Sequence, residues 1–429
     1  MLKRTSIATA VIAATGLSGA ASAQDSDQER IDALERKIQI LSEEIEGSRR
    51  EGLVSEEFDY QPAYGVGPAG AKIYSVDQGL SIGGYGHGFY RNSSAEGADE
   101  ADFYRQIFYV GYRFNDWLLL NTEIEFEHTN EAFTEFAYLD FLLSEKANVR
   151  AGLMLTPMGF VNEIHEPPTY FGNIRPEVEK RIIPTTSREN GVGLYGNLTD
   201  SLEYRVYVQN SFNGISDGAS TIEGYDLRGI RQKGGNALAE DLAVTGRLDW
   251  KPQNGVMIGG SFWSGEMGHG QELFDAESPN DSLGTPGIQT NLYELHAEYK
   301  RGGWWLRGLA AQAQIDDADL LSQSLDENVG ETMTGWYAEV GYDIMPWIAD
   351  RPEQALYPWV RHTDLETQAS MPKGYEADPA NDRTITEVGL HYMPHPNVVV
   401  KVDYRDFRSE ADDSTNNQDE LQLGIGYNF

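Results

Sequence analysis

The sequence predicts an all-β fold, namely a transmembrane antiparallel β-barrel of about 16 strands with a short N-terminal coiled-coil helix. Three observations lead there: an apolar–polar alternation repeated along the chain, connections that alternate in length, and a final strand with two unlike faces. Residues 419–429 read DELQLGIGYNF, so large apolar residues alternate with small or polar ones. A period of two with such different faces predicts a strand between two different media.

Composition narrows the class of protein. The 429 residues include 45 Gly, 23 Tyr and no Cys, which suits an all-β envelope protein and excludes thiolate metal sites and cysteine nucleophiles. A formal net charge of −35 argues against a nucleic-acid partner. The mean hydropathy of −0.48 argues against a bundle of membrane helices. It does not argue against a barrel, because half of each barrel strand faces water.

The first 23 residues are typical of a secretory signal peptide. Lys3 and Arg4 precede an apolar run over residues 7–19, which is too short to span a bilayer, and residues 21–23 (ASA) form a small-x-small cleavage site. We therefore expect residues 1–23 to be removed on export and the mature chain to begin at Gln24.

Residues 24–51 are predicted to form a periplasmic coiled-coil helix. Apolar residues recur there at alternating steps of three and four: Ile31, Leu34, Ile38, Leu41 and Ile45. Ile at a with Leu at d favours two strands, so the seam does not by itself predict a trimer. The alternative is an amphipathic helix lying on the chain's own surface. A polar and then Gly- and Pro-bearing linker is predicted over residues 52–78.

Residues 79–429 are predicted to form the barrel. Runs of about ten residues with period-two alternation follow one another to the C-terminus, and counting them gives about 16 strands, with 14 or 18 as alternatives. Aromatic residues near strand ends suit the interfacial girdles of a membrane barrel. These are Phe89, Tyr90, Phe114, Trp117, Trp250, Trp263, Trp304, Trp305, Trp347 and Tyr404.

The connections alternate in length. Short turns are predicted at residues 115–116, 145–148, 198–201, 251–254, 301–303 and 394–396. Long, mostly acidic connections are predicted at residues 213–240, 264–287, 316–331, 368–382 and 409–418. This asymmetry is typical of outer-membrane barrels, so we expect the acidic loops to lie outside the cell. The Asp-rich stretch at 316–319 lacks the spacing of a calcium loop, and we expect no metal site.

One long segment interrupts the repeated strand pattern. Residues 156–190 lack alternation, contain five prolines and carry many apolar residues, so we do not expect them to extend into solvent. We interpret them as a loop that folds into the barrel and narrows a pore; the alternative is an external loop packed against a neighbouring subunit. Charges at a constriction set ion preference. The candidate constriction residues are Glu163, His165, Glu166, Arg175, Glu177, Glu179, Lys180, Arg181, Arg188 and Glu189.

The position of a residue in the period-two alternation of its strand, its strand parity, predicts whether a charged side chain points into the lumen. The basic set is Arg105, Arg113, Arg150, Arg205, Arg247, Arg307, Arg361, Lys401 and Arg405. The acidic set is Glu123, Glu125, Glu127, Glu203, Asp249, Glu294, Glu298, Glu339, Glu387 and Asp403. A mixed lining of this kind supports passage of water and polar solutes, with charges paired or networked, and does not set the sign of selectivity.

Several segments together carry a family resemblance: GPAGAKIY at 67–74, GLSIGGYG at 79–86, GLMLTPMGF at 152–160, RENGVG at 188–193 and YNF at the C-terminus. They resemble the phosphate-selective porin O and P family over most of the chain beyond the linker. The resemblance implies a trimeric 16-stranded barrel with an inward-folded constriction loop. It also implies phosphate selection by a lumenal arginine ladder and by lysines near the constriction. Separately, the strand that ends at Phe429 resembles the last strand of bacterial outer-membrane barrels, whose terminal Phe is part of their assembly signal.

The leading functional hypothesis is a porin in the outer membrane of a Gram-negative-type bacterium. It would conduct small ions and polar solutes passively, including anions such as phosphate, with membrane lipid and two further copies of the chain as partners and no cofactor. One alternative is a structural or adhesive barrel with a plugged pore. Another is a barrel hydrolase, but six scattered histidines adjoin no nucleophile motif, so we predict no catalytic residues. These are His128, His165, His269, His362, His391 and His395.

Overall fold

The computed structural model describes residues 36–37, 61–94, 99–325, 327–411 and 417–429. The predicted signal peptide, and all of the predicted coiled coil except Arg36 and Lys37, lie outside the described residues. They belong to a unit, Met1–Asp59, that is separate from the unit Tyr60–Phe429 discussed below. None of the helices in the described ranges has the length and apolar character needed to cross a membrane.

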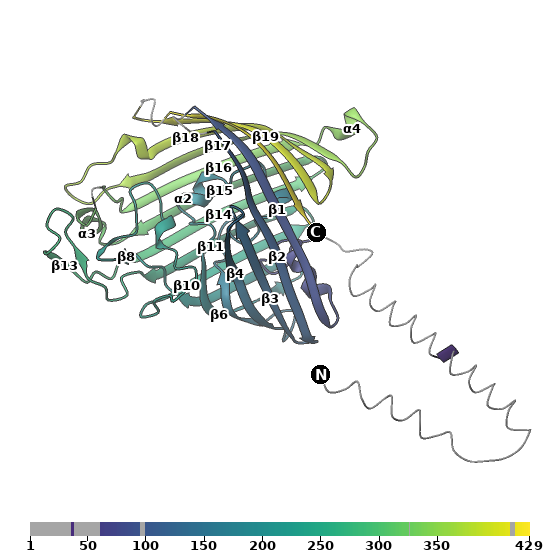
Figure 1. The fold of residues 1–429 in the computed structure, drawn as a ribbon, viewed down its shortest axis with the longest axis horizontal. Helices are drawn as coiled ribbons and strands as arrows, with labels where there is room; N and C mark the ends of the chain where they lie inside the picture. Colours follow the sequence, from purple (N-terminus) through teal and green to yellow (C-terminus); the bar gives the residue numbers. More distant parts are fainter. Residues whose placement is uncertain (1–35, 38–60, 95–98, 326, 412–416) are drawn as a thin grey trace, which may run out of the picture. The chain divides into compact units, whose positions relative to one another are not determined.

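The second unit is built on one closed antiparallel barrel, which confirms the predicted fold class and strand number (Figure 1). The sixteen strands, in hydrogen-bonding order, are β1 (Gly79–Ser93), β2 (Glu100–Asn115), β3 (Leu118–Glu127), β4 (Glu131–Phe141), β5 (Asn148–Leu155), β6 (Arg188–Thr199), β7 (Leu202–Asn210), β10 (Leu242–Gln253), β11 (Val256–Glu266), β14 (Gln289–Arg301), β15 (Trp304–Ile315), β16 (Thr332–Tyr342), β17 (Ala355–Ser370), β18 (Asp382–His395), β19 (Val398–Ser409) and β20 (Asp419–Asn428).

The last strand closes the barrel against the first. Strand β20 pairs antiparallel with β1 from Tyr85↔Asn428 to Ser93↔Glu420. Beyond this ladder the backbone N–H of Phe429 donates to the carbonyl of Gly84 at 2.9 Å, and the N–H of Gly84 donates back to Phe429 at 3.0 Å. Closure in this way leaves no strand edge with unpaired backbone groups.

The two faces of the wall have opposite chemistry. Large apolar side chains are exposed on the outside, for example Leu295 (72%) and Ile425 (53%), while charged side chains on the same strands are buried. Two of the predicted girdle residues depart from this pattern. Trp263 and Trp305 are fully buried, because strand parity places them on the inner face. Trp263 stacks on Phe212 at 4.5 Å between ring centroids, and Trp305 packs on Phe171 at 4.4 Å.

Short and long connections lie at opposite ends of the barrel, as the alternation in length predicts. In Figure 1 the long loops with β8 (Ile215–Ser216), β13 (Ser282–Gly284) and α3 (Ala318–Gln323) lie at one end. The helix α4 (Met345–Ile348) and the C-terminus lie at the other. The remaining short elements are η1 (Gly70–Ser75), η2 (Pro167–Thr169), α2 (Glu177–Arg181), β9 (Ala219–Ser220), η3 (Arg228–Ile230), β12 (Leu273–Phe274) and η4 (Pro379–Asn381).

The inward loop, residues 156–187 between β5 and β6, lies inside the barrel. All of its residues are buried except Ile164, Thr169, Ile174, Lys180 and Arg181. Its apolar side chains, including Phe160, Val178 and Ile182, join a core cluster with inner-wall residues such as Leu309 and Tyr337. The interior on this side is therefore filled by packed side chains.

A predicted loop and a predicted linker are also packed. The long connection predicted at residues 213–240 was assigned to the cell exterior; in the structure its residues Ile222, Leu227 and Ile230 are fully buried in the same core cluster. Residues 52–78 were predicted to be a linker, but the described part, from residue 61, belongs to the barrel unit. Val66 and Ile73 there are nearly fully buried, and η1 contacts β1, β2 and β3.

Replacement of Phe171 should weaken the packing of the inward loop against the barrel wall. Its ring is fully buried and lies parallel to Trp359 at 5.5 Å, with an interplanar angle of 4°. Phe171→Ala should cost about 3–5 kcal/mol of unfolding free energy, as truncation of a buried aromatic does. Denaturant unfolding of the purified protein in detergent would measure the loss. Phe262→Ala is the matched control, because Phe262 is 38% exposed on the outer face; equal losses in both variants would contradict the prediction.

Candidate functional site

The inner wall carries the charges that strand parity predicts. Arg113, Glu127, Glu298 and Arg307 are partly buried. The others are at most 8% exposed: Arg105, Arg150, Arg205, Arg247, Arg361, Lys401, Arg405, Glu123, Glu125, Glu203, Asp249, Glu294, Glu339, Glu387 and Asp403. Period-two alternation sorts these side chains to one face because successive residues of a strand point to opposite faces.

Most wall arginines are neutralised by carboxylates. Arg361 lies 2.7 Å from Glu339 and 3.0 Å from Glu387, and Arg405 lies 3.3 Å from the same Glu387 carboxylate and 3.2 Å from Glu420. Buried charges are tolerated when they are paired and hydrogen bonded. This part of the wall therefore does not carry a continuous ladder of unpaired arginines.

A second network ties the inward loop to the opposite wall. Arg205 lies 2.7 Å from Asp249 and 3.2 Å from Glu163 of the inward loop, and Arg247 lies 2.9 Å from Asp249. The predicted constriction residue Glu163 is thus a buried partner of two wall arginines. Burial raises the pKa of Glu163 above its usual value, although the nearby Arg205 and Arg247 act to lower it.

Two further side chains, those of Glu179 and Asn162, anchor the inward loop. The carboxylate of Glu179 accepts hydrogen bonds from the backbone N–H groups of Phe160 (2.7 Å) and Val161 (2.8 Å) and from the Tyr337 hydroxyl (2.6 Å). Asn162 bridges the two ends of the loop by donating to the carbonyls of Thr156 (2.6 Å) and Ser187 (3.1 Å). These contacts satisfy loop backbone groups that have no strand partner.

Glu166 joins three distant parts of the chain. One of its oxygens accepts from the backbone N–H of Ala69 at 2.9 Å, and the other accepts from the side chain of Asn428 at 2.6 Å. Burial raises the pKa of Glu166 to about 7, although both hydrogen bonds act to lower it.

The remaining predicted basic residues of the constriction fall into two groups. Lys180 and Arg181 lie 4.0 and 2.8 Å from Glu177, and Arg188 lies 3.7 Å from Glu135, so each has an acidic partner. Arg175 has no carboxylate within 4.0 Å among the described residues. It is 9% exposed.

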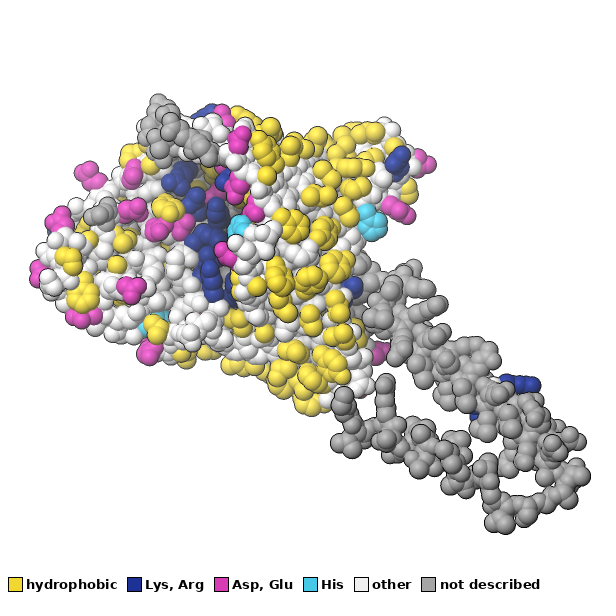
Figure 2. All heavy atoms as spheres, viewed as in Figure 1, with side chains coloured by type: hydrophobic (Ala, Val, Ile, Leu, Met, Phe, Trp, Pro, Cys, Tyr) yellow, Lys and Arg dark blue, Asp and Glu magenta, His cyan; other side chains and the backbone are white. Residues whose placement is uncertain are grey.

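Arg175 belongs to a group that we name the loop cation cluster: Arg175, Arg228, Arg231 and Lys233. In the described ranges no carboxylate oxygen lies within 4.0 Å of a side-chain nitrogen of any of the four; the backbone N–H of Arg228 donates to Asp226 at 2.8 Å. Arg228 and Arg231 both donate to the carbonyl of Thr185, Arg231 at 2.9 Å. Burial, together with the like charges of Arg228, Arg188 and Arg175, lowers the pKa of Arg231. Figure 2 shows basic side chains gathered in a hollow of the molecule.

Sequence reasoning missed three members of this cluster. Arg228, Arg231 and Lys233 fall within a stretch of six residues in the long connection that we predicted at 213–240 and assigned to the cell exterior. A basic stretch inside a set of otherwise acidic loops was the available signal. Its inward position depends on the packing of its apolar neighbours against the inward loop.

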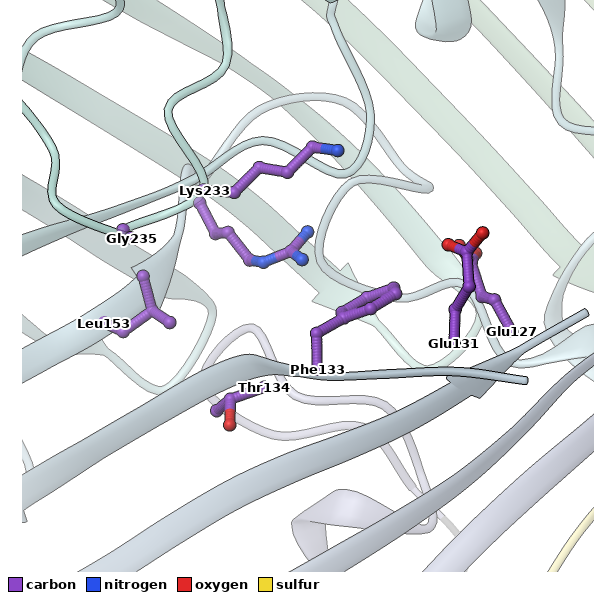
Figure 3. Close-up of a pocket in the computed structure, with 9 residues that line it drawn as sticks. Glu127, Glu131, Phe133, Thr134, Leu153, Lys233 and Gly235 are labelled. Carbon is purple, nitrogen blue, oxygen red and sulfur yellow. The ribbon is translucent and has the colours of Figure 1, made fainter. Parts of the chain in front are cut away.

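A cavity of about 500 Å³ lies beside the cluster (Figure 3). Its lining residues are Glu127, Glu131, Phe133, Thr134, Leu153, Arg188, Lys233, Gly234 and Gly235. In Figure 3, Lys233 lies at one side of the view and Glu127 and Glu131 lie together at the other, with the Phe133 ring between them. Opposite charges on facing walls create an electric field across the cavity.

Solved structures with this fold are outer-membrane proteins. OmpF of Salmonella typhi, in complex with daunomycin, is 15% identical, with a TM-score of 0.54 over 82% of this chain and 98% of that one. The anion-selective porin from Comamonas acidovorans is 11% identical, with a TM-score of 0.52 over 82% and 100%. In vitro folded OmpT of Vibrio cholerae, in its trimer form, is 10% identical, with a TM-score of 0.51 over 82% and 99%. At these identities the likeness shows the fold alone.

One relative is much closer in sequence. The chain is 36% identical over 374 residues to an uncharacterized protein of Aquifex aeolicus (strain VF5), and the match covers 82% of each protein. No model of a known protein family matches the chain. The chain therefore belongs to the family of this Aquifex aeolicus protein and has the barrel fold seen in outer-membrane porins.

Proposed function

We propose that the protein is an outer-membrane porin, a passive channel for small ions and polar solutes that favours anions. The observation that carries the proposal is the loop cation cluster beside the charged cavity. Positive charges without acidic partners attract anions and repel cations, and their effect is larger in a narrow, partly dehydrated passage than in bulk water. Most arginines of the inner wall contribute less, because carboxylates neutralise them.

The membrane location follows from the chemistry of the barrel surface. An apolar outer face, an interior rich in charged groups and a closed ladder of backbone hydrogen bonds are what a lipid environment requires. The signal-like residues 1–23 and the terminal Phe429 support export and insertion into an outer membrane. The proposed assembly is a homotrimer, supported by the trimer form of OmpT.

Membership in the phosphate-selective porin O and P family is part of the proposal, and phosphate is a proposed solute. The sequence segments described above support the assignment, and the anion-selective porin of Comamonas acidovorans shares the fold. The cations that would serve phosphate here are those of the loop cation cluster. We do not assign phosphate selection to an unbroken arginine ladder along the wall.

A specific observation favours a second candidate, a structural barrel closed by its own chain. The described residues from 61 onward enter the same compact unit as the barrel, and Gly65 to Ala71 are buried there. Together with the inward loop they fill part of the interior. Absence of any stable conductance from purified, folded protein in planar bilayers would favour this candidate and contradict the channel.

Neutralisation of the loop cation cluster should reduce anion preference. At an effective dielectric constant of about 40, a unit charge about 8 Å from the ion path contributes about 1 kcal/mol, roughly a fivefold change in anion partition. The reversal potential across a bilayer with a salt gradient should have the sign of anion selectivity, and Arg231→Gln should move it toward zero. Arg181→Gln is the control, since Glu177 and Asp226 already pair with Arg181. A cation-selective wild type would contradict the proposal.

Anion selectivity should also depend on pH through Lys233. Burial and the neighbouring cations Arg231, Arg188 and Arg228 lower the pKa of Lys233, against the opposing effect of Glu127. The ammonium form is the charged form, so its contribution is present below the pKa of Lys233. It should be lost as the pH rises through a pKa below the usual lysine value of about 10.4.

Reversal potentials recorded at increasing pH would measure this loss. The Lys233→Arg variant retains its charge over the same range and should remove this part of the pH dependence. An identical pH profile in both proteins would assign the effect to another group.

A further inference from the structure

Three buried side chains converge where the inward loop meets the wall. Glu123 of β3, Glu135 of β4 and His165 of the inward loop each present one ligand atom, and these atoms lie within 4.8 Å of one another. The Nε2 atom of His165 lies 3.5 Å from Glu135 Oε2 and 3.7 Å from Glu123 Oε1. The three residues are 2% exposed or less.

The polar atoms of this cluster have few partners. Among the described residues, His165 Nε2, Glu123 Oε2 and both carboxylate oxygens of Glu135 are buried without a hydrogen bond. A buried carboxylate or imidazole nitrogen without a partner carries a large desolvation cost. Something other than the described protein groups is therefore needed to satisfy these atoms.

The other ring nitrogen of His165 favours metal ligation by Nε2. His165 Nδ1 lies 3.2 Å from the backbone carbonyl of Asn162, a geometry in which Nδ1 carries the hydrogen and donates it. This tautomer leaves a lone pair on Nε2, directed at the two carboxylates. A backbone carbonyl that orients the non-ligating nitrogen is the usual outer partner of a metal-bound histidine.

The distances fit a bound divalent ion. Two ligand atoms that are each about 2.1 Å from a metal, at angles of 110–120°, are about 3.4–3.6 Å apart. The imidazole–carboxylate separations of 3.5 and 3.7 Å match this spacing. One imidazole and two carboxylates suit a divalent transition-metal ion better than Mg²⁺ or Ca²⁺, which prefer oxygen ligands throughout.

The surrounding groups complete the site. The Tyr85 hydroxyl donates to Glu123 Oε1 at 3.2 Å, and Arg105 donates to the carbonyl of His165 at 2.9 Å. Arg188 lies 3.7 Å from Glu135 Oε1, the oxygen that does not face His165. Glu125, also buried, has one unpartnered oxygen. The arginines offset part of the charge of the acidic groups and leave the facing lone pairs free.

A second histidine between two carboxylates shows the contrast. His296 Nε2 lies 3.0 Å from Asp249, and its Nδ1 lies 2.9 Å from Glu294. Both ring nitrogens are therefore engaged by carboxylates at hydrogen-bond distance. Like His165, His296 lies between two carboxylates, but it has no free lone pair directed at a shared point.

We propose that Glu123, Glu135 and His165 bind a divalent transition-metal ion of the Zn²⁺ class, which fastens the inward loop to strands β3 and β4. The proposal departs from the expectation, drawn from the sequence, that the chain has no metal site. It does not depend on ion conduction, because the metal would have a structural role whether or not the barrel conducts.

The test is Zn²⁺ binding by the full-length mature protein, purified in detergent, stripped with chelator and titrated with Zn²⁺ alone. We expect one Zn²⁺ per chain, and a loss of affinity of at least about tenfold in His165→Gln and in Glu135→Gln. Glu131→Gln is the matched control, since Glu131 lies on the same strand and lines the cavity without joining the three ligands; its affinity should be unchanged. Failure of the wild type to bind Zn²⁺, or equal binding by His165→Gln, would overturn the proposal.

Cobalt gives a readout that needs no variant, in case the substituted proteins do not fold. Co²⁺ bound to wild type at a site with few ligands absorbs visible light far more strongly than hydrated Co²⁺, and Zn²⁺ should displace it. A spectrum indistinguishable from that of hydrated Co²⁺ would overturn the proposal and indicate that the three groups share protons instead.

Discussion

The structure depends on one requirement. The backbone N–H and C=O groups of a loop enclosed in the barrel need hydrogen-bond partners, although no neighbouring strand supplies them. The inward loop contains 32 residues, of which five are more than slightly exposed. Carboxylates and basic side chains of the wall take the place of the missing ladder. Lys401, for example, donates to the carbonyls of Tyr170 and Gly172 at 2.9 and 2.7 Å, and Asp403 accepts from Asn173 at 2.9 Å. The charged side chains of the inner wall thus serve to bind the inward loop.

Because the wall charges bind the loop and one another, they exert a smaller net electric field in the barrel interior. Arg361 and Arg405 are held by three carboxylates between them on the inner wall, so they contribute little net field to a passing ion. Charge without an ion-pair partner lies instead on loop residues such as Arg228 and Arg231 and on Lys401 of the wall, whose hydrogen bonds go to backbone carbonyls. The arginines that pair with wall carboxylates and the arginines that lack an acidic partner are therefore different groups.

Period-two alternation was enough to predict the barrel and the direction of wall side chains such as Arg361 and Glu387, because orientation in a strand is local. The girdle assignment of Trp263 and Trp305 was wrong, because it relied on closeness to strand ends, whereas the alternation places both on the inner face. Which charges are paired could not be predicted, since pairing depends on strand register and on the position of the inward loop. The burial of Val66 and Ile73 was missed because a Gly- and Pro-bearing composition reads as linker, whereas their burial depends on contacts far along the chain.

The position of Glu166 has a consequence for the order of assembly. Its two carboxylate oxygens contact residues 69 and 428, so one side chain near the middle of the sequence binds segments close to both ends of the barrel unit. Those contacts span 97 and 262 residues along the chain. Contacts between such distant residues form late, because the entropy of closing the intervening chain must be overcome first. The contact between Glu166 and Asn428 therefore forms only when the last strand has arrived, and a barrel without β20 has an inward loop that lacks this anchor.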